Sequence, residues 1–82
     1  MCYASELESY RDAQDSLVSM QQSGCADARR ISRTHLDRSV SELRALGTGF
    51  AVYWADHFNR RADEVEADMQ HAEALMRRDG YL

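Results

Sequence analysis

FAVYWADHFNRRADEVEADMQHAEALM occupies residues 50–76 and contains neither glycine nor proline. Apolar or alanine positions recur in it at alternating steps of three and four residues, which places them along one side of an α-helix. From Ala55 onward this repeat continues for three heptads, a length typical of a coiled-coil seam. The stretch therefore predicts a long third helix over residues 50–78.

This apolar seam is longer than the rest of the chain can cover. The predicted helix would span roughly 40 Å, whereas the segments before it allow helices of only about 30 Å. A second copy would shield the excess, because two-fold pairing is the commonest way in which soluble chains cover such a surface. We therefore expect a homodimer that pairs through seven seam positions: Ala55, Phe58, Ala62, Val65, Met69, Ala72 and Met76.

The first quarter of the chain predicts a helix over residues 5–22. Ser5 and Glu8 have the spacing of a capping box, in which each side chain covers a free backbone amide at the helix start. Ser23-Gly24 ends the helix, because glycine tolerates the left-handed conformation that closes such ends. Its expected core face consists of Leu7, Tyr10, Gln14, Leu17 and Gln21, widened by Ala13 and Val18.

A second helix is predicted over residues 27–46. The segment Gly47-Thr48-Gly49 then breaks the chain, and Thr48 is available as the cap of the third helix. The predicted fold class is all-α: a helical hairpin packed on a long third helix, within one small domain over residues 1–82. The expected core face of the second helix consists of Ala28, Ser32, Leu36, Ser39, Val40, Leu43 and Leu46.

Charge is distributed unevenly along the chain, whose formal net charge is −4. Residues 1–23 hold four acidic residues and one arginine, residues 24–47 hold three acids and five arginines, and residues 48–82 hold seven acids and four arginines. We interpret this pattern as attraction between opposite faces, either inside the fold or across a dimer. The overall negative charge argues against broad non-specific binding to nucleic acids.

Aromatic and arginine side chains are the candidate contacts for a partner protein, because Trp, Tyr and Arg are favoured at binding hot spots. We expect a non-catalytic protein-interaction module: a small regulator, adaptor or inhibitor, of the kind that phages and other mobile elements often encode. The carboxylates along residues 56–73 offer a variant, in which they imitate a nucleic-acid backbone. The predicted partner-binding residues are Phe50, Tyr53, Trp54, Arg29, Arg30 and Arg33.

The segment Ile31–Arg38, followed by Val40 and Leu43, resembles the recognition helix of Fis-type helix-turn-helix proteins. In that family a serine begins the helix and neighbouring polar and basic side chains face DNA. The resemblance implies an alternative function as a DNA-binding transcriptional regulator. It departs from the family at Arg30, where the turn glycine would stand. The residues that the resemblance assigns to DNA are Ser32, Arg33, Thr34, His35 and Arg38.

Motifs of catalysis and cofactor binding are missing from the sequence. No Gly-x-Ser-x-Gly, phosphate loop or Cys-x-x-Cys occurs, so we expect neither an enzyme nor a cofactor. Glu64, Asp68 and His71 lie along one side of the third helix, but no second acid-x-x-His motif accompanies them, and we expect no metal site. Cys2 and Cys25 are too few for a disulfide scaffold. Without a membrane-spanning segment or a secretory signal, the expected location is cytoplasmic.

Overall fold

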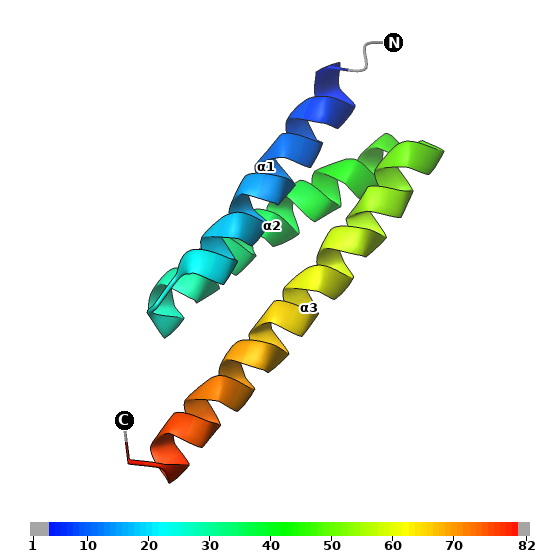
Figure 1. Ribbon diagram of the computed structural model, residues 1–82. Coiled ribbons are helices and arrows are strands. Elements are labelled where there is room, and N and C mark those ends of the chain that lie inside the picture. The colour runs from blue at the N-terminus through cyan, green and yellow to red at the C-terminus, as the bar shows by residue number, and fades with distance from the viewer. Residues whose placement is uncertain (1–3, 81–82) are drawn as a thin grey trace.

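A computed structural model describes residues 4–80, which form three α-helices (Figure 1). The helices are α1 (Ala4–Gln22), α2 (Ala26–Leu46) and α3 (Gly49–Arg78). No strand occurs in this part of the chain, and the predicted all-α class with three helices is confirmed. Cys2, Tyr81 and Leu82 lie outside the described residues.

The helices form an elongated bundle with extents of 55 × 17 × 13 Å. The turn between α1 and α2 has three residues and the turn between α2 and α3 has two, so each helix runs antiparallel to the one before it. The α2 helix lies between the other two and contacts both, whereas α1 and α3 contact each other least (Figure 1). The hairpin of α1 and α2 packed on α3 is thus the observed architecture.

The core is built from one apolar stripe on each helix. Phe58 is fully buried near its middle, and small residues beside it allow the helices to approach closely. Every buried side-chain polar atom among the described residues has a hydrogen-bond partner. The buried apolar residues are Ala13, Leu17 and Met20 of α1, Leu36, Val40 and Leu43 of α2, and Ala51, Ala55, Phe58, Ala62 and Val65 of α3.

The face that α1 buries differs from the predicted one. Ser9 and Met20 are buried, and the Ser9 hydroxyl donates a hydrogen bond of 3.3 Å to Oε2 of Glu42 on α2. Gln14 and Gln21 are exposed instead. Burying two amide side chains without partners would cost free energy, and rotating α1 about its own axis avoids this cost. The helix itself is therefore predicted correctly, but its buried face is rotated about the helix axis by about one residue position from the predicted face.

Helix boundaries follow the residues that can cap them. Gly47 has a φ of 71°, a left-handed conformation that glycine adopts without a Cβ clash, and it closes α2. Thr48 then caps α3, since its hydroxyl accepts a hydrogen bond of 3.1 Å from the backbone N–H of Ala51. The expected role of Ser5 as a cap is wrong, because α1 already begins at Ala4 and Ser5 lies inside its first turn.

The cap at Thr48 gives a first testable prediction. We expect Thr48→Ala to lower the free energy of unfolding by about 1 kcal/mol, because one N–H at the start of α3 loses its acceptor. Thr48→Ser keeps an oxygen at the same place and should lose much less. Urea denaturation followed by helical circular dichroism measures both variants. Equal stability of Thr48→Ala and Thr48→Ser would show that the hydroxyl contributes nothing.

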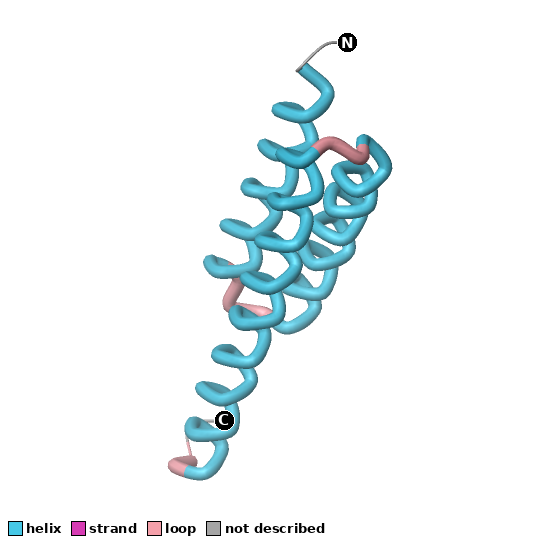
Figure 2. Tube along the Cα trace, turned by 90° about the vertical axis from the view of Figure 1, so that its right-hand side faces the viewer, coloured by secondary structure: helices cyan, strands magenta, loops and turns pink. Residues whose placement is uncertain are grey.

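The last third of α3 extends beyond the other two helices (Figure 2). We call residues 69–78 the α3 overhang. At ~1.5 Å per residue the 30-residue α3 is about 45 Å long, against about 32 Å for α2. Burial stops at Val65, Met69 is half-buried, and Met76 remains 47% exposed. The overhang expected from the seam length is therefore present.

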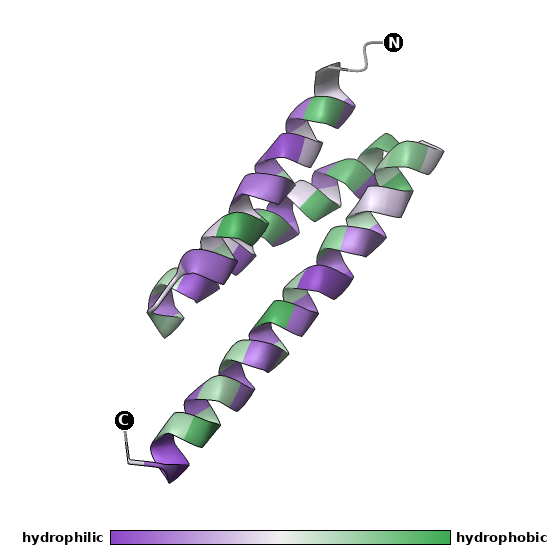
Figure 3. Cartoon of the chain, viewed as in Figure 1, coloured by the Kyte–Doolittle hydropathy of each residue, from purple (hydrophilic) through white to green (hydrophobic). Residues whose placement is uncertain are grey.

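The seam on α3 divides into a covered part and an open part. Four of its positions are buried in the core that the chain forms by itself, so these four are not available for the predicted dimer contact. Hydrophobic positions nevertheless continue into the last turns of α3 (Figure 3). The covered positions are Ala55, Phe58, Ala62 and Val65, and those that the chain leaves half-buried or exposed are Met69, Ala72 and Met76.

Candidate functional site

Aromatic side chains gather at the end of the bundle where α3 begins. Phe50 is 41% exposed and Tyr53 is 59% exposed, whereas Trp54 is half-buried and packs against the core. We call Phe50, Tyr53 and Trp54 the aromatic patch. Consecutive helix positions cannot all face one core, so part of this cluster has to reach the surface. The sequence left open whether these rings are core or contact surface, and the structure packs Trp54 against the core and leaves Phe50 and Tyr53 exposed.

Trp54 fixes the patch to the rest of the fold. Its ring lies edge-on to Tyr10 of α1, with ring centroids 4.9 Å apart, and edge-on to Tyr53 at 5.2 Å. His57 stands edge-on to Trp54 at 4.9 Å. Such edge-to-face arrangements suit the charge distribution of aromatic rings and contribute more than burial alone. The exposed rings of Phe50 and Tyr53 thus both pack against Trp54, with ring centroids 6.4 and 5.2 Å from it.

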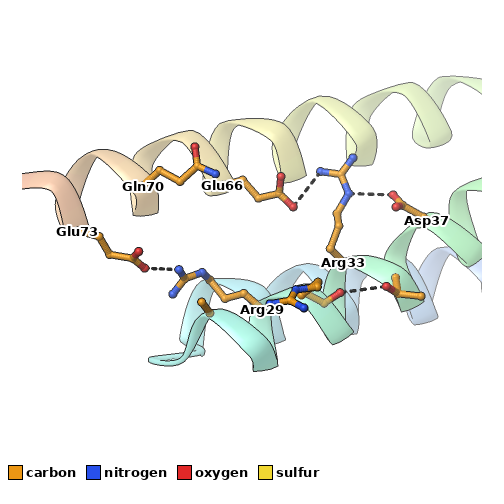
Figure 4. Close-up of a pocket in the computed structure, with 9 residues that line it drawn as sticks. Arg29, Arg33, Asp37, Glu66, Gln70 and Glu73 are labelled. Carbon is orange, nitrogen blue, oxygen red and sulfur yellow. Dashed lines mark hydrogen bonds and ion pairs between the residues drawn. The ribbon is translucent and has the colours of Figure 1, made fainter.

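Arg29 and Arg33 of α2 point toward α3 (Figure 4). The Arg33 side chain is only 17% exposed. Its Nε donates to Asp37 at 2.8 Å, its Nη1 to Asp63 at 3.0 Å and its Nη2 to Asn59 at 3.0 Å. Oε1 of Glu66 lies 3.6 Å from Nη1. One guanidinium therefore joins three carboxylates and an amide from two helices.

These contacts alter the acidity of Arg33. Burial by itself lowers the pKa of the guanidinium, because it disfavours the charged form. The hydrogen bonds to Asp37 and Asp63, with the negative charges of Asp37 and Glu66, outweigh burial and leave the pKa of Arg33 raised. A raised pKa in the folded state means that the charged form stabilises the fold at every pH below the ordinary arginine value, and this contribution is lost only above it.

Two further arginines were predicted to bind a partner. Arg29 is 11% exposed and forms an ion pair with Glu73 on the α3 overhang. Arg30 is well exposed and pairs with Asp27 one turn earlier in α2, at 2.7 Å. Arg29 and Arg33 thus belong to the contact between α2 and α3, and only Arg30 presents its guanidinium to solvent.

The carboxylates along α3 are largely neutralised inside the chain. Five of the six acids between residues 56 and 73 form ion pairs with arginines, which leaves Asp68 without one among the described residues. Imitation of a nucleic acid requires a row of unpaired negative charges. The α3 helix therefore does not present such a row. The pairs are Asp56–Arg44, Asp63–Arg33, Glu64–Arg61, Glu66–Arg33 and Glu73–Arg29.

The segment that resembles a recognition helix lies inside a continuous helix. Ser32 would begin the helix in that family, but α2 starts at Ala26 and continues without a break to Leu46. Thr34 donates its hydroxyl hydrogen bond of 3.1 Å to the backbone carbonyl of Arg30. The helix-turn-helix geometry that the resemblance implies is therefore missing from this segment. His35 and Arg38 are exposed, Ser32 is half-buried, and Arg33 makes the ion pairs described above.

A groove separates the α1–α2 turn from the overhang. Its volume is about 400 Å³, and it lies against the open part of the α3 seam. Arg29 and Glu73 form its polar edge. The residues that line it are Ser23, Gly24, Ala26, Arg29, Met69, Ala72, Glu73 and Met76.

Residues 4–80 hold no group of three or more His, Cys, Asp or Glu side chains placed to share a metal ion. Asp68 and His71 are both exposed on α3. Cys25 is a free, exposed cysteine at the start of α2. Over the same residues, none of the helices has the length and apolar character needed to cross a membrane.

Sequence reasoning missed several residues of these surfaces. Arg44 and Asp56, 2.8 Å apart, tie the end of α2 to the start of α3, and Leu7 and Val52 are exposed. The opposite charges of residues 24–47 and 48–82 indicated attraction but could not specify pairs, because residues far apart in sequence meet only once the helices pack.

Comparison with known proteins gives no relative for this chain: no family model, no curated protein and no solved structure matches it.

Proposed function

We propose that the protein is a non-catalytic protein-interaction module, which acts as a small regulator, adaptor or inhibitor by binding another protein through the aromatic patch. The observation that carries this proposal is that the rings of Phe50 and Tyr53 are exposed to solvent while both pack against Trp54. Ordered aromatic side chains lose little conformational entropy on binding and bury a large area. They are therefore suited to anchor a partner.

Tyr53→Ala tests this surface. We expect the variant to lose its native partner in affinity purification from the host, with a fall in affinity of at least tenfold, or about 1.4 kcal/mol. Its circular dichroism and melting temperature should stay close to those of the original chain, because Tyr53 contributes little to the core.

Val52→Ala is the matched control for Tyr53→Ala. Val52 is also exposed and neighbours Tyr53 in sequence, but one residue along a helix turns the side chain by about 100°. It should retain the partner. If Tyr53→Ala retains the partner as well, the aromatic patch is not the binding surface.

We propose in addition that two copies associate through the α3 overhang. The chain buries the first four positions of the predicted seam and leaves the last three, Met69, Ala72 and Met76, half-buried or exposed. Leu75 beside them is also exposed. Ala72 lies between the two methionines, so it would let two overhangs approach closely while the methionines fill the space on either side.

Analytical ultracentrifugation over a range of concentrations tests the dimer. We expect the average mass to rise toward that of two chains, and Met76→Glu to keep the protein monomeric because it places a charge in the contact. Val52→Glu, at the other end of α3, should still associate. A wild-type protein that stays monomeric at every concentration would contradict the proposed dimer. It would not bear on the proposal that the aromatic patch binds another protein.

A further inference from the structure

A surface hollow lies on α3 beside the aromatic patch. Its volume is about 340 Å³, and Tyr53 belongs both to the hollow and to the patch. We call it the Arg60 hollow. Positions 53, 56 and 60 are three and four residues apart and are therefore neighbours on the helix surface. A partner that covers the Tyr53 ring, which is 59% exposed, therefore reaches the hollow as well. The residues that line it are Tyr53, Asp56, Asn59 and Arg60.

Arg60 brings to this hollow a positive charge that no described residue neutralises. It is exposed, and its side chain forms neither an ion pair nor a hydrogen bond within residues 4–80. The carboxylate in the hollow, that of Asp56, is bound by Arg44 of α2 at 2.8 Å. The two acids one turn further along α3 are also engaged by other arginines. They are Asp63, which pairs with Arg33, and Glu64, which pairs with Arg61.

Two other groups of the hollow are hydrogen-bond donors. Oδ1 of Asn59 accepts a hydrogen bond of 3.0 Å from Nη2 of Arg33. A guanidinium only donates, so Asn59 turns its oxygen to Arg33 and keeps its amide nitrogen for another acceptor. Neither that nitrogen nor the Tyr53 hydroxyl donates to another described residue. The hollow therefore offers a cation and two further donors, while its own carboxylate is already bound.

We infer that the partner of the aromatic patch is a protein segment with an aspartate or glutamate whose carboxylate binds Arg60 in this hollow. This inference rests on the proposed function of the patch and adds the chemical class of the partner's contact. A carboxylate fits a guanidinium because its two oxygens accept two parallel N–H bonds. A partner that covered Arg60 without an acceptor would bury an unpaired charge, which costs free energy.

A single free arginine favours an acidic side chain over the other charged occupants. Nucleic acids gain affinity from several phosphate contacts at once. A row of phosphates would run from Arg60 past Asp63 and Glu64, whose arginine partners are engaged. A basic segment would place its own cations against Arg60 and be repelled there. Tyrosine and arginine are also residue types enriched at binding hot spots. The contact that fits is one carboxylate beside an apolar side chain that covers Tyr53.

Two synthetic peptides test the inference. Each has about eight residues, which in extended form exceed the roughly 15 Å from Phe50 to Arg60 along α3. Both contain the same tryptophan and leucines, and the remaining positions carry glutamate in one and glutamine in the other. Nitrogen-15 NMR spectra of the full chain are recorded during titration at about 0.15 M salt, where long-range charge is screened. We expect the glutamate peptide to bind at least about fivefold more tightly, with shifts at residues 50–60 and at the Arg60 Nε–H signal.

Substitutions of Arg60 locate the preference. In Arg60→Gln the two peptides should bind with equal affinity, and in Arg60→Glu the glutamine peptide should bind more tightly. The matched control is Arg77→Gln, which changes the net charge equally but lies about 25 Å further along α3, in its last turn. It should keep the preference for the glutamate peptide. Circular dichroism checks that all three variants fold, as expected for exposed residues.

Equal binding of the two peptides to the original chain would overturn the inference, and so would a preference that persists in Arg60→Gln. Absence of binding by both peptides would also overturn it.

Failure of the inference is distinguishable from failure of the proposed function. If both peptides shift residues 50–54 equally and are lost with Tyr53→Ala, the docking surface stands and the acidic contact is wrong. If Arg60→Gln still captures the native partner while Tyr53→Ala does not, the same conclusion follows. Capture of the native partner by Tyr53→Ala contradicts the proposed function itself.

Discussion

Phe58→Ala is expected to unfold the protein, or to lower its free energy of unfolding by about 3–5 kcal/mol. Phe58 is fully buried, and its ring packs near those of Tyr10 and Trp54, so truncation leaves a cavity in the core. A domain of this size has a total stability on the order of 5 kcal/mol, so the loss approaches the whole. Urea denaturation monitored by circular dichroism measures the change.

The matched control is Phe50→Ala, the same substitution two turns earlier in α3. Phe50 is partly exposed, so we expect a loss of less than about 1 kcal/mol. Because Phe50 belongs to the aromatic patch, this control concerns stability and not partner binding. If both variants lose the same stability, the site of Phe58 either collapses without a cavity or is less well packed than the structure shows.

The three helices could be predicted because local signals and periodicity agree. Gly47 and Thr48 lie between the apolar repeats of α2 and α3. Gly47 ends α2 and Thr48 caps α3, as expected from the sequence. In α2 the pattern indicated the buried face, since Leu36, Val40 and Leu43 recur on it. Agreement between local preference and global pattern is what specifies a fold.

Periodicity was less informative in α1, where apolar residues are sparse. Leu7 and Gln14 were expected on the buried face but are exposed, whereas Ser9 and Met20 are buried and Tyr10 packs against the core as predicted. Small and flexible side chains pack well but contribute weakly to a hydrophobic pattern. The orientation of α1 about its axis therefore depends on the surfaces of α2 and α3. It could not be predicted from the sequence of α1 alone.

The seam on α3 shows the same limit for function. Its regular spacing predicts a continuous apolar face but not what covers each part of it. Packing assigns Val65 and the positions before it to the core of one chain and leaves Met76 open. Likewise the sequence offered Arg29 and Arg33 as contacts for a partner, although α3 supplies the carboxylates that occupy them. The candidate surfaces consist of the side chains that remain exposed after the helices have packed and formed their ion pairs.

That division makes Arg33 the second site of large expected effect. We expect Arg33→Met to lower the free energy of unfolding by about 2–3 kcal/mol. Methionine retains an unbranched apolar chain but removes the charge, so Asp37, Asp63 and Glu66 lose their shared cation. Chemical denaturation at neutral pH measures the loss, and the loss should shrink at high salt as repulsion between these carboxylates is screened.

Arg38→Met is the matched control, since Arg38 lies on the same helix, is exposed and forms no ion pair with the other described residues. Its loss should stay below about 0.5 kcal/mol. Adding Asp63→Asn to Arg33→Met removes one of the stranded charges and should recover part of the stability, whereas Asp63→Asn alone should destabilise. Because the pKa of Arg33 is raised, its own titration cannot cause any change below strongly alkaline pH. If Arg33→Met and Arg38→Met are equally stable, the ion pairs of Arg33 do not hold α3 against α2, and the apolar stripe and the pairs of Arg29 and Arg44 position the long helix without them.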